Sequence, residues 1–220
     1  MKDYLVCRIT YDEARPWVML KHYAKRMPSI TKAFALYENK TIVGVCCFGN
    51  PACQANSKLG EFKAIELLRV VVETKNKNAA SMLISKSLKL LDKPIVVVSY
   101  ADKGINHVGY IYQATNWFYT GISKGDVEYI INDKHYHRKG AFDKYGTGSK
   151  IKLKNIDPNI KILKQSDKHR YFYCIGSKKH KKEMLIELKT KYPILPYPKG
   201  ETKRYDASAK LPISIKSFPL

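Results

Sequence analysis

The chain has 220 residues, of which 45% are hydrophobic, and it carries a formal net charge of +21 from 40 basic and 19 acidic residues. This length predicts one domain with an elaboration, or one domain and a small second one, with enough apolar content for a core. No apolar run approaches about 20 residues, so we expect no membrane span. The N-terminus, MKDYLVCRIT, has no secretory apolar region, which indicates a cytoplasmic protein.

The first 120 residues predict alternating strands and helices, from their apolar periodicity and turn residues. The expected elements, in chain order, are a strand (4–10), a helix (13–27) stopped by Pro28, a hairpin (33–38 and 41–48) around Asn39-Lys40, a long strand (62–73), a helix (79–91), a buried strand (95–98), a helix from Asn106 to about Thr115, and a strand from Trp117. A hairpin that precedes a strand–helix–strand unit favours an α/β fold with a mixed sheet covered by helices.

Beyond residue 121 the character of the sequence changes. The expected elements are a second hairpin (127–131 and 135–138) around Asn132-Asp133, a Gly/Lys-rich loop (144–154), a strand (171–175), a basic helix (178–191) capped by Ser177, and an extended proline-rich tail after Tyr192. We therefore expect a core at 1–122, a basic elaboration that includes the final core strand at 123–192, and a tail at 193–220.

The positive charge indicates a polyanionic partner, most simply DNA or RNA. Residues 1–120 carry 17 basic and 9 acidic residues, whereas residues 121–220 carry 23 and 10. The alternative explanation is coding bias, because an AT-rich gene would also give 33 lysines and only 7 arginines.

The turn at residues 75–81, KNKNAAS, connects the long strand to a helix and contains Lys75 and Lys77. Backbone N–H groups at the start of a helix attract phosphate, and the two lysines add positive charge. The turn therefore suits a pyrophosphate, although an ordinary surface turn with a helix cap is an equally good interpretation.

The order of the elements and this turn resemble the GNAT acyltransferases, whose pyrophosphate motif reads Q/R-x-x-G-x-G/A. Lys75 takes the first position of that motif, Asn78 the glycine position and Ala80 the last. Asn78 departs from the motif but tolerates the left-handed backbone geometry of a glycine. The resemblance implies an acyl-CoA donor whose site includes Lys75, Asn78, Ala79, Ala80 and Ser81.

In GNAT enzymes the thioester of coenzyme A lies in the V between the fourth and fifth strands, which would here be 62–73 and 95–100. A tyrosine on the following helix often donates its proton to the leaving thiolate. Tyr110 and Tyr112 are the candidates, and they point to different faces because they are two residues apart. The alternative is that either tyrosine only packs in the core with a hydrogen-bonded hydroxyl.

A narrower resemblance is carried by several phrases of the sequence. They are WVMLKHYAKRMP (17–28), ELLRVVVE (66–73), NAAS (78–81), SYADKGINHVGYIYQATNW (99–117), KHRYFYCIGSKKHKK (168–182) and YPILPYPK (192–199). Together they resemble the phage Mom family, which is related to GNAT enzymes and modifies adenine in DNA. The run AD-x4-H-x-G-x-IYQATNW is its most specific part.

This resemblance implies the function that we expect for the chain. The family product is N6-(methylcarbamoyl)adenine, which is made in duplex phage DNA, in the cytoplasm of the infected bacterial host, and protects it from restriction. Acetyl-CoA is the implied donor, and iron has been associated with the family. The partners would be double-stranded DNA and an acyl-CoA, without a membrane.

The resemblance also implies catalytic residues. Asp102 would act as base or orient the adenine amino group, and Tyr112 is preferred over Tyr110 as general acid because of its relation to Asp102 and His107. His22 and Tyr23 match a His-Tyr pair of the family and would serve adenine stacking, base chemistry or metal binding. The metal candidates are His22, Tyr23, Asp102 and His107. Structural explanations remain open: a solvated His22, a packed Tyr23 and a turn aspartate.

Arg69 interrupts an apolar strand, and a buried arginine requires an anion, so we count it with the donor site. The alternative is a structural ion pair with Glu66 or Glu73. Two basic clusters would face DNA. One is His135, His137, Arg138 and Lys139 on the second hairpin, and the other is Lys178, Lys179, Lys181 and Lys182 on the basic helix. Solvated basic faces, or a metal at the histidine cluster, are the alternatives.

Two other functions remain possible from the sequence. One is an ordinary GNAT N-acetyltransferase acting on a protein or RNA amine, which would leave DNA unmodified. The other is a non-catalytic nucleic-acid-binding module, which would bind DNA with a steep salt dependence and would not respond to acetyl-CoA.

Overall fold

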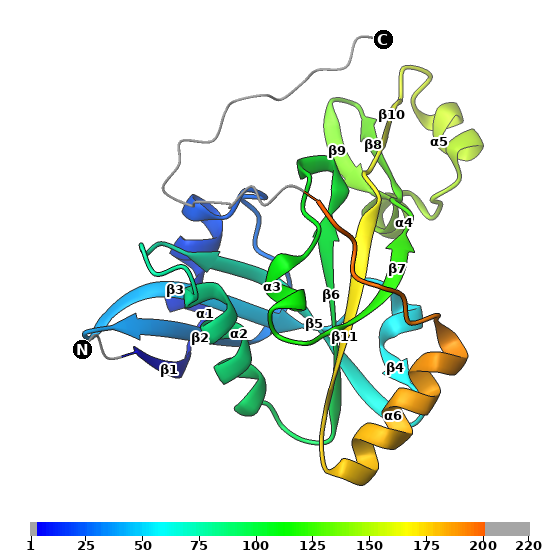
Figure 1. The fold of residues 1–220 in the computed structure, drawn as a ribbon. Helices are drawn as coiled ribbons and strands as arrows, with labels where there is room; N and C mark the ends of the chain where they lie inside the picture. Colours follow the sequence, from blue (N-terminus) through cyan, green and yellow to red (C-terminus); the bar gives the residue numbers. More distant parts are fainter. Residues whose placement is uncertain (1–3, 201–220) are drawn as a thin grey trace. The chain divides into compact units, whose positions relative to one another are not determined.

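The structure is a computed structural model that describes residues 4–200, without the side chain of Lys139 (Figure 1). The chain divides into two compact units. The first unit consists of residues up to Tyr100, of Gly109–Gly121 and of the chain from Arg170, and the second consists of Ala101–Val108 and Ile122–His169. Residues from Arg170 onward thus belong to the same unit as the N-terminal half. No helix in the described part of the chain could span a membrane.

The main sheet has the strand order β1-β2-β3-β5-β6-β11-β7, with β4 paired to β5. The strands are β1 (Tyr4–Ile9), β2 (Ile30–Glu38), β3 (Thr41–Gly49), β4 (Lys58–Leu59), β5 (Phe62–Val72), β6 (Ile95–Asp102), β7 (Phe118–Ser123) and β11 (Lys168–Ile175). β1, β2, β3 and β5 pair antiparallel in this order, whereas β5 and β6 pair parallel. The predicted mixed sheet is therefore confirmed.

The first hairpin illustrates why local turn chemistry is a dependable signal. Asn39 and Lys40 connect β2 to β3 with φ angles of 48° and 70°. Two consecutive positive φ angles characterise the turn that best matches the twist of a hairpin, and Asn adopts them readily. The predicted hairpin is confirmed.

The helices cover both faces of the N-terminal half of the sheet. α1 (Tyr11–Pro16) continues into a π-helix, η1 (Trp17–Lys21), and packs through Val18 onto β2 and β3, where Cys47 belongs to the same cluster. α2 (Ala79–Lys89) lies on the opposite face, because Ser87 contacts the neighbouring Cys46 at 3.2 Å. Alternate residues of a strand point to opposite faces, which explains this division.

The prediction of a helix over 13–27 is wrong in its second half. Helical structure starts at Tyr11, where Thr10 forms a capping box with Glu13, and ends at Lys21. His22 adopts an extended conformation, and Lys25 has a φ of 40° in the turn that follows. The wider π turn and this strained turn break a periodicity that would otherwise continue to Met27.

The predicted helix over 106–115 is also shorter than expected. Asp102 rather than Asn106 caps a helical turn, the 3-10 helix η3 (Lys103–Ile105), and Asn106 is left-handed with φ 57°. α3 covers only Tyr110–Gln113. The predicted strand and helix at 171–175 and 178–191 are confirmed as β11 and α6 (Lys178–Lys191), whose cap Ser177 accepts a hydrogen bond from the His180 N–H.

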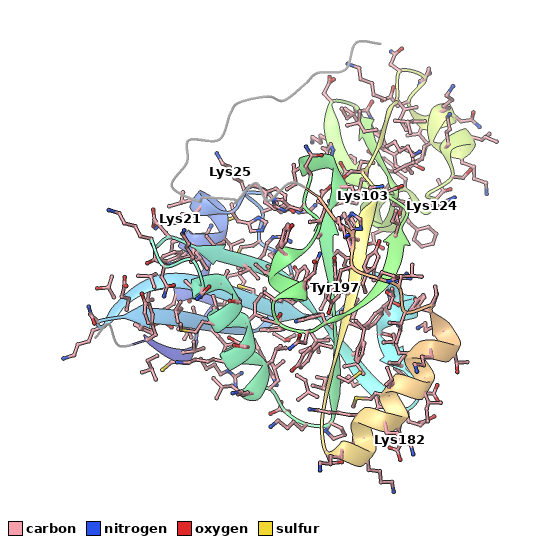
Figure 2. All side chains as sticks on the ribbon, viewed as in Figure 1. Lys21, Lys25, Lys103, Lys124, Lys182 and Tyr197 are labelled. Carbon is pink, nitrogen blue, oxygen red and sulfur yellow. The ribbon has the colours of Figure 1, made fainter. Side chains whose placement is uncertain are left out.

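The segment 193–200 forms neither helix nor strand and lies against β7 and α3. Leu195 donates its N–H to the Tyr119 carbonyl at 2.9 Å, and the Tyr197 hydroxyl donates to the Trp117 carbonyl at 2.8 Å (Figure 2). Gln113 donates to the Pro198 carbonyl at 3.3 Å. The division of the chain into a core, an elaboration and a tail stays a prediction, and residues 201–220 lie outside the described residues.

The second unit has its own sheet and core. Its strands are β8 (Val127–Ile131), β9 (Lys134–His137) and β10 (Lys161–Lys164), in the order β10-β8-β9. α4 (Arg138–Tyr145) and α5 (Lys150–Ile156) pack onto this sheet through Ala141 and Leu153. The predicted hairpin around Asn132-Asp133 is confirmed, whereas the predicted loop at 144–154 is wrong because it contains the end of α4 and most of α5.

Candidate active site

The pairing of β5 with β6 is short. Four residues of each strand pair, Ala64–Leu67 with Val96–Ser99, and in the described chain the ladder stops there. β5 continues to Val72 and pairs with β3 instead. Two parallel strands that separate toward their carboxyl ends leave backbone groups available between them, and α/β proteins place ligands at such points. We call the region beyond Leu67 and Ser99 the fork.

Tyr112 lies at the base of the fork. Its hydroxyl is 2.8 Å from the Ser99 hydroxyl, which in turn is 2.8 Å from the Leu67 carbonyl oxygen. Tyr112 is 7% exposed and Ser99 is fully buried. Burial raises the pKa of Tyr112 strongly, the hydrogen bond with Ser99 opposes this rise, and Tyr23 and Glu66 add to it. The phenol is therefore protonated at neutral pH.

Aromatic packing fixes the ring of Tyr112. Its centroid lies 5.1 Å from those of Trp117 and Tyr171. Gly109, with φ 77°, permits this arrangement, because a Cβ there would lie 2.5 Å from the Tyr171 ring and 3.0 Å from the Tyr112 ring. Tyr110, by contrast, is 43% exposed and its hydroxyl donates to the Gly200 carbonyl at 3.2 Å. The structure thus places the two candidate tyrosines in different environments.

His22 and Tyr23 follow the π-helix directly. Their ring centroids are 4.3 Å apart at an interplanar angle of 31°. The N–H of Ala24 donates to His22 Nδ1 at 3.1 Å, so in a neutral imidazole the proton is on Nε2. His22 is 6% exposed and Tyr23 37% exposed. Because Tyr23 affects the pKa values of both Tyr112 and Arg69, the structure brings these three side chains into one neighbourhood.

Arg69 lies on the arm of β5 beyond the fork. Its Nη1 donates to the Leu68 carbonyl at 2.7 Å and its Nη2 to the Arg26 carbonyl at 3.5 Å, while its Nε is buried without a hydrogen-bond partner. Among residues 4–200, no carboxylate lies within ion-pair distance of it. The expected alternative partner Glu73 pairs with Lys21 instead. Burial lowers the pKa of Arg69 and so disfavours its charge, and the charge of Glu66 offsets this only in part.

Glu66 belongs to the same neighbourhood and was considered from the sequence only as a partner of Arg69. It accepts the N–H of Ala52 at 2.9 Å, and its charge raises the pKa values of Tyr100, Tyr112 and Arg69. No local sequence signal marks it, because a glutamate in a strand is usually solvated. It supplies a negative charge close to the phenol of Tyr112.

The turn before α2 has the features of an anion site. Asn78 caps the helix with φ −99°, so it is not left-handed, and the expectation of glycine-like geometry is wrong. Its N–H is held by the Asn76 side chain at 2.9 Å. Within the described chain no acceptor bonds the N–H groups of Ala80 and Ser81, whereas the Ser81 hydroxyl donates to the Asn78 carbonyl at 3.0 Å. Lys75 is exposed at the same turn.

Asp102 and His107 belong to the second unit. The Asp102 carboxylate accepts the hydroxyl of Ser166 and the N–H of Gly104, the latter at 2.8 Å, through the same oxygen, Oδ1. Asp102 is thus half-buried and anchored, with one oxygen committed to the turn. Burial lowers the pKa of His107, and the charge of Asp102 opposes this. His107 is therefore neutral at pH 7.

The four expected metal ligands are divided between the two units. His22 and Tyr23 lie in the first unit, and Asp102 and His107 in the second. No group of three His, Cys, Asp or Glu side chains in the described chain could hold a metal ion. The described residues therefore give iron no support, and we derive no step through a metal.

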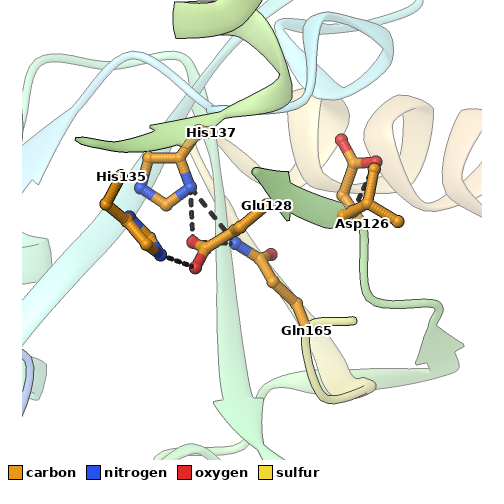
Figure 3. A network of polar contacts seen from close by, with 6 residues as sticks. Asp126, Glu128, His135, His137 and Gln165 are labelled. Atoms are coloured by element: carbon orange, nitrogen blue, oxygen red, sulfur yellow. Dashed lines mark hydrogen bonds and ion pairs between the residues drawn. The ribbon is translucent and has the colours of Figure 1, made fainter. Parts of the chain in front are cut away.

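The histidines of the second hairpin have an acidic partner that the sequence did not reveal (Figure 3). One carboxylate oxygen of Glu128, on β8, lies 2.8 Å from His135 Nε2. The other oxygen lies 2.6 Å from His137 Nδ1. Gln165 donates to the same carboxylate at 2.6 Å. Residues on neighbouring strands face each other across an antiparallel pair, so only the register of β8 with β9 could have shown this. This carboxylate balances part of the positive charge of the cluster.

The remaining basic candidates are exposed. Arg138 lies 3.6 Å from the exposed Asp126. On α6 the side chains of Lys178, Lys179, Lys181 and Lys182 are exposed, and within residues 4–200 none forms an ion pair. Figure 2 labels Lys182 on this helix. The inward side of this helix packs through Met184 and Leu188. The hairpin cluster belongs to the second unit and α6 to the first.

Comparisons with known proteins identify a similar fold and the family of the chain. Arabidopsis thaliana NAA60 in complex with acetyl-CoA superposes with a TM-score of 0.50 at 12% identity, over 79% of this chain and 99% of that chain. A Bacillus subtilis acetyltransferase in complex with CoA gives 0.44 at 12% identity, over 80% and 99%. The first likeness shows the acetyltransferase fold. The curated proteins gave no match. The model of the Mom protein family matches residues 3–199, and the chain therefore belongs to the Mom protein family.

Proposed function

We propose that this protein is a GNAT-like acyltransferase that modifies the N6 amino group of adenine in duplex DNA. Family membership supports a modification enzyme, and the acetyltransferase fold supports acyl transfer. The observation that carries the proposal is the buried, protonated phenol of Tyr112 at the base of the fork, because acyl transfer from a thioester needs a proton donor in a protected place.

The donor in this proposal is an acyl-CoA, most simply acetyl-CoA, which would supply the acyl group as a thioester. Its pyrophosphate would be received by the N–H groups of Ala80 and Ser81, with Lys75 contributing charge. Asn78 and Ala79 shape the turn through hydrogen bonds to Asn76. Arg69, whose charge Glu66 offsets only in part and whose Nε has no hydrogen-bond partner, would bind a further anionic or carbonyl oxygen near the fork.

The remaining residues would act on the acceptor and the proton. The lone pair of adenine N6 is delocalised into the ring, so the amine is a poor nucleophile and gains from a base that acts in the transition state. Asp102 would remove or orient that proton through its second carboxylate oxygen, since Oδ1 is committed to the turn. Tyr112 would protonate the leaving sulfur. The stacked pair His22-Tyr23 would offer a face on which an extruded base can stack.

DNA would be held through backbone phosphates. The four exposed lysines of α6 without carboxylate partners are the better candidates, because the histidines of the hairpin are already engaged with Glu128. Arg138 and Lys139 could contribute from the second unit. By analogy with the family, the modification would protect phage DNA from host restriction.

Mass analysis of nucleosides tests this function. DNA from cells that express the protein, digested to nucleosides, should contain a modified deoxyadenosine that cells expressing Tyr112→Phe contain at a greatly reduced level. N6-methylcarbamoyl and N6-acetyl products differ by one NH group, so the mass also names the product. Unmodified DNA, together with acetylation of a protein or RNA amine by the same preparation, would contradict the proposal and favour an ordinary N-acetyltransferase.

A further inference from the structure

Ser99 ends the β5–β6 ladder and lies beside the candidate acid. It follows four consecutive apolar residues, Ile95–Val98, and its side chain is fully buried. A buried hydroxyl is unfavourable unless it is hydrogen-bonded. Its Oγ has two neighbours at 2.8 Å, the carbonyl oxygen of Leu67 and the hydroxyl of Tyr112. Ser99 therefore connects the end of the ladder to Tyr112.

The two contacts determine where the protons lie. A carbonyl oxygen can only accept, so the Ser99 proton must point to Leu67 if that contact is a hydrogen bond. A serine hydroxyl has a single proton, so the contact with Tyr112 requires the phenol to donate to Ser99 Oγ. The Tyr112 proton consequently points toward Ser99 and not into the fork. A general acid in this state must redirect its proton before it can transfer it.

We propose that Ser99 is a positioning residue that controls the proton of Tyr112. In the free protein Ser99 accepts the hydrogen bond of the phenol and holds the ring hydroxyl at the base of the fork. During transfer the Ser99 hydroxyl turns from the Leu67 carbonyl and donates to the Tyr112 oxygen. The first part depends only on the geometry, whereas the second part rests on the proposed function.

The step balances in atoms and charge. The O–H bond of Tyr112 breaks and an S–H bond forms on the leaving thiolate, so the negative charge moves from sulfur to the phenolate oxygen. Ser99 then exchanges a neutral hydrogen bond to a carbonyl for one to an anion, and charge-assisted hydrogen bonds are roughly twice as strong as neutral ones. Solvent afterwards returns a proton to Tyr112. The exchange favours the phenolate, which makes the buried phenol a stronger acid.

The first part is tested by NMR of the hydroxyl protons, independently of any activity. Wild-type protein should show a slowly exchanging tyrosine hydroxyl proton with a cross-peak to the β-protons of Ser99, and Tyr112→Phe should remove it and so assign it. Ser99→Thr should retain the slow exchange, and Ser99→Ala should lose it. A Tyr112 hydroxyl proton that contacts other groups in the wild type would overturn the proposal.

The second part is tested by a double-mutant cycle in the nucleoside assay. Ser99→Ala should slow modification by about 10- to 100-fold, the usual value of a hydrogen bond to a charged group, and Ser99→Thr should restore most of it. In the Tyr112→Phe background, Ser99→Ala should change the rate of modification by less than about twofold, because the hydroxyl to which Ser99 would donate is absent. An equal loss in both backgrounds would contradict the positioning role. Absence of modification by the wild type would overturn the proposed function and this second part with it.

Discussion

The two units carry similar charge but different chemistry. The second unit, with 56 residues, has 12 basic and 7 acidic residues, and both units carry roughly one net positive charge per ten or eleven residues. Residues 121–220 are more basic than residues 1–120, but this difference in net charge does not separate the two units. The reason is that residues from Arg170 onward belong to the first unit. The first unit holds the fork with Tyr112 and Arg69, whereas the second holds Asp102 and four of the six histidines. Charge alone therefore does not indicate which unit would bind DNA, and the polar side chains distinguish the units better.

The largest effect should come from Asp102 in the second unit. Asp102→Asn keeps an oxygen that can accept from Ser166 and Gly104 but removes the base, so modification should fall by about 10²–10⁴-fold while DNA affinity stays nearly unchanged. Asp167→Asn is the matched control, because Asp167 also accepts a backbone N–H, from Gly125, within this unit. Retained activity of Asp102→Asn in the nucleoside assay would remove Asp102 from the mechanism.

The next largest loss of modification should come from substitution of Tyr112 in the first unit. Tyr112→Phe removes the proton donor and leaves the ring packing against Trp117 and Tyr171, so modification should fall by about 10²-fold. Tyr110→Phe, two residues away on the same short helix, should keep wild-type activity. Equal rates for the two variants would show that the buried phenol is not the acid.

Substitution of Arg69 should change the affinity for acetyl-CoA without lowering the stability of the protein. Arg69→Leu removes a partly buried charge that burial disfavours, so we expect acetyl-CoA affinity to fall by about 10- to 100-fold while the free energy of unfolding is unchanged or higher. Arg8→Leu, on β1 at the edge of the same sheet, serves as the control. Calorimetric titration and urea unfolding measure the two quantities. Reduced stability with unchanged affinity would instead assign Arg69 a structural role.

The basic surfaces of the two units can be compared directly. One variant replaces with glutamine the lysines Lys178, Lys179, Lys181 and Lys182, and the other replaces the exposed Lys150, Lys152, Lys154 and Lys161. The first variant should bind DNA more weakly, and its log–log salt slope should flatten by about 0.9 for each phosphate that it no longer neutralises. The second should resemble wild type. The reverse result would place the phosphate-binding surface in the second unit.

Acid should weaken the second unit more than the first. Burial lowers the pKa values of His107 and His169, both in the second unit, below that of an unfolded histidine, about 6.5. The unfolded state therefore binds more protons as the pH falls through this value, so stability decreases. Amide exchange should show that peptides of the second unit lose protection first, and that His107→Gln reduces the effect. Equal loss in both units would contradict this assignment.

Much of the fold followed from local signals. The two hairpins were predictable because Asn39-Lys40 and Asn132-Asp133 adopt the positive φ angles that such turns require. The prediction of a helix over 13–27 was wrong in its second half, because His22 is extended after a π-helix. Apolar spacing does not reveal this change of backbone conformation. α4 and α5 were missed because few of their residues are buried and because Gly146 and Gly148 lie between them, which favours a loop prediction.

The candidate site was predictable only where a residue type is unusual for its position. Arg69 stood out in an apolar strand, and Tyr112 was found through the family resemblance. Ser99, Glu66 and Glu128 were not identified as members of a site, because their roles come from partners on other elements. Ser99 gave a weak signal, since it is the first hydroxyl after an unbroken apolar run.

Hydrogen–deuterium exchange with and without acetyl-CoA tests the central claim most directly, that the fork of the first unit is the donor site. Peptides that cover Leu68–Val72 and Asn78–Met82 should exchange more slowly on addition of acetyl-CoA, and Arg69→Leu should require a higher acetyl-CoA concentration for the same protection. Unchanged exchange at saturating acetyl-CoA, or protection confined to residues 122–169, would contradict the claim.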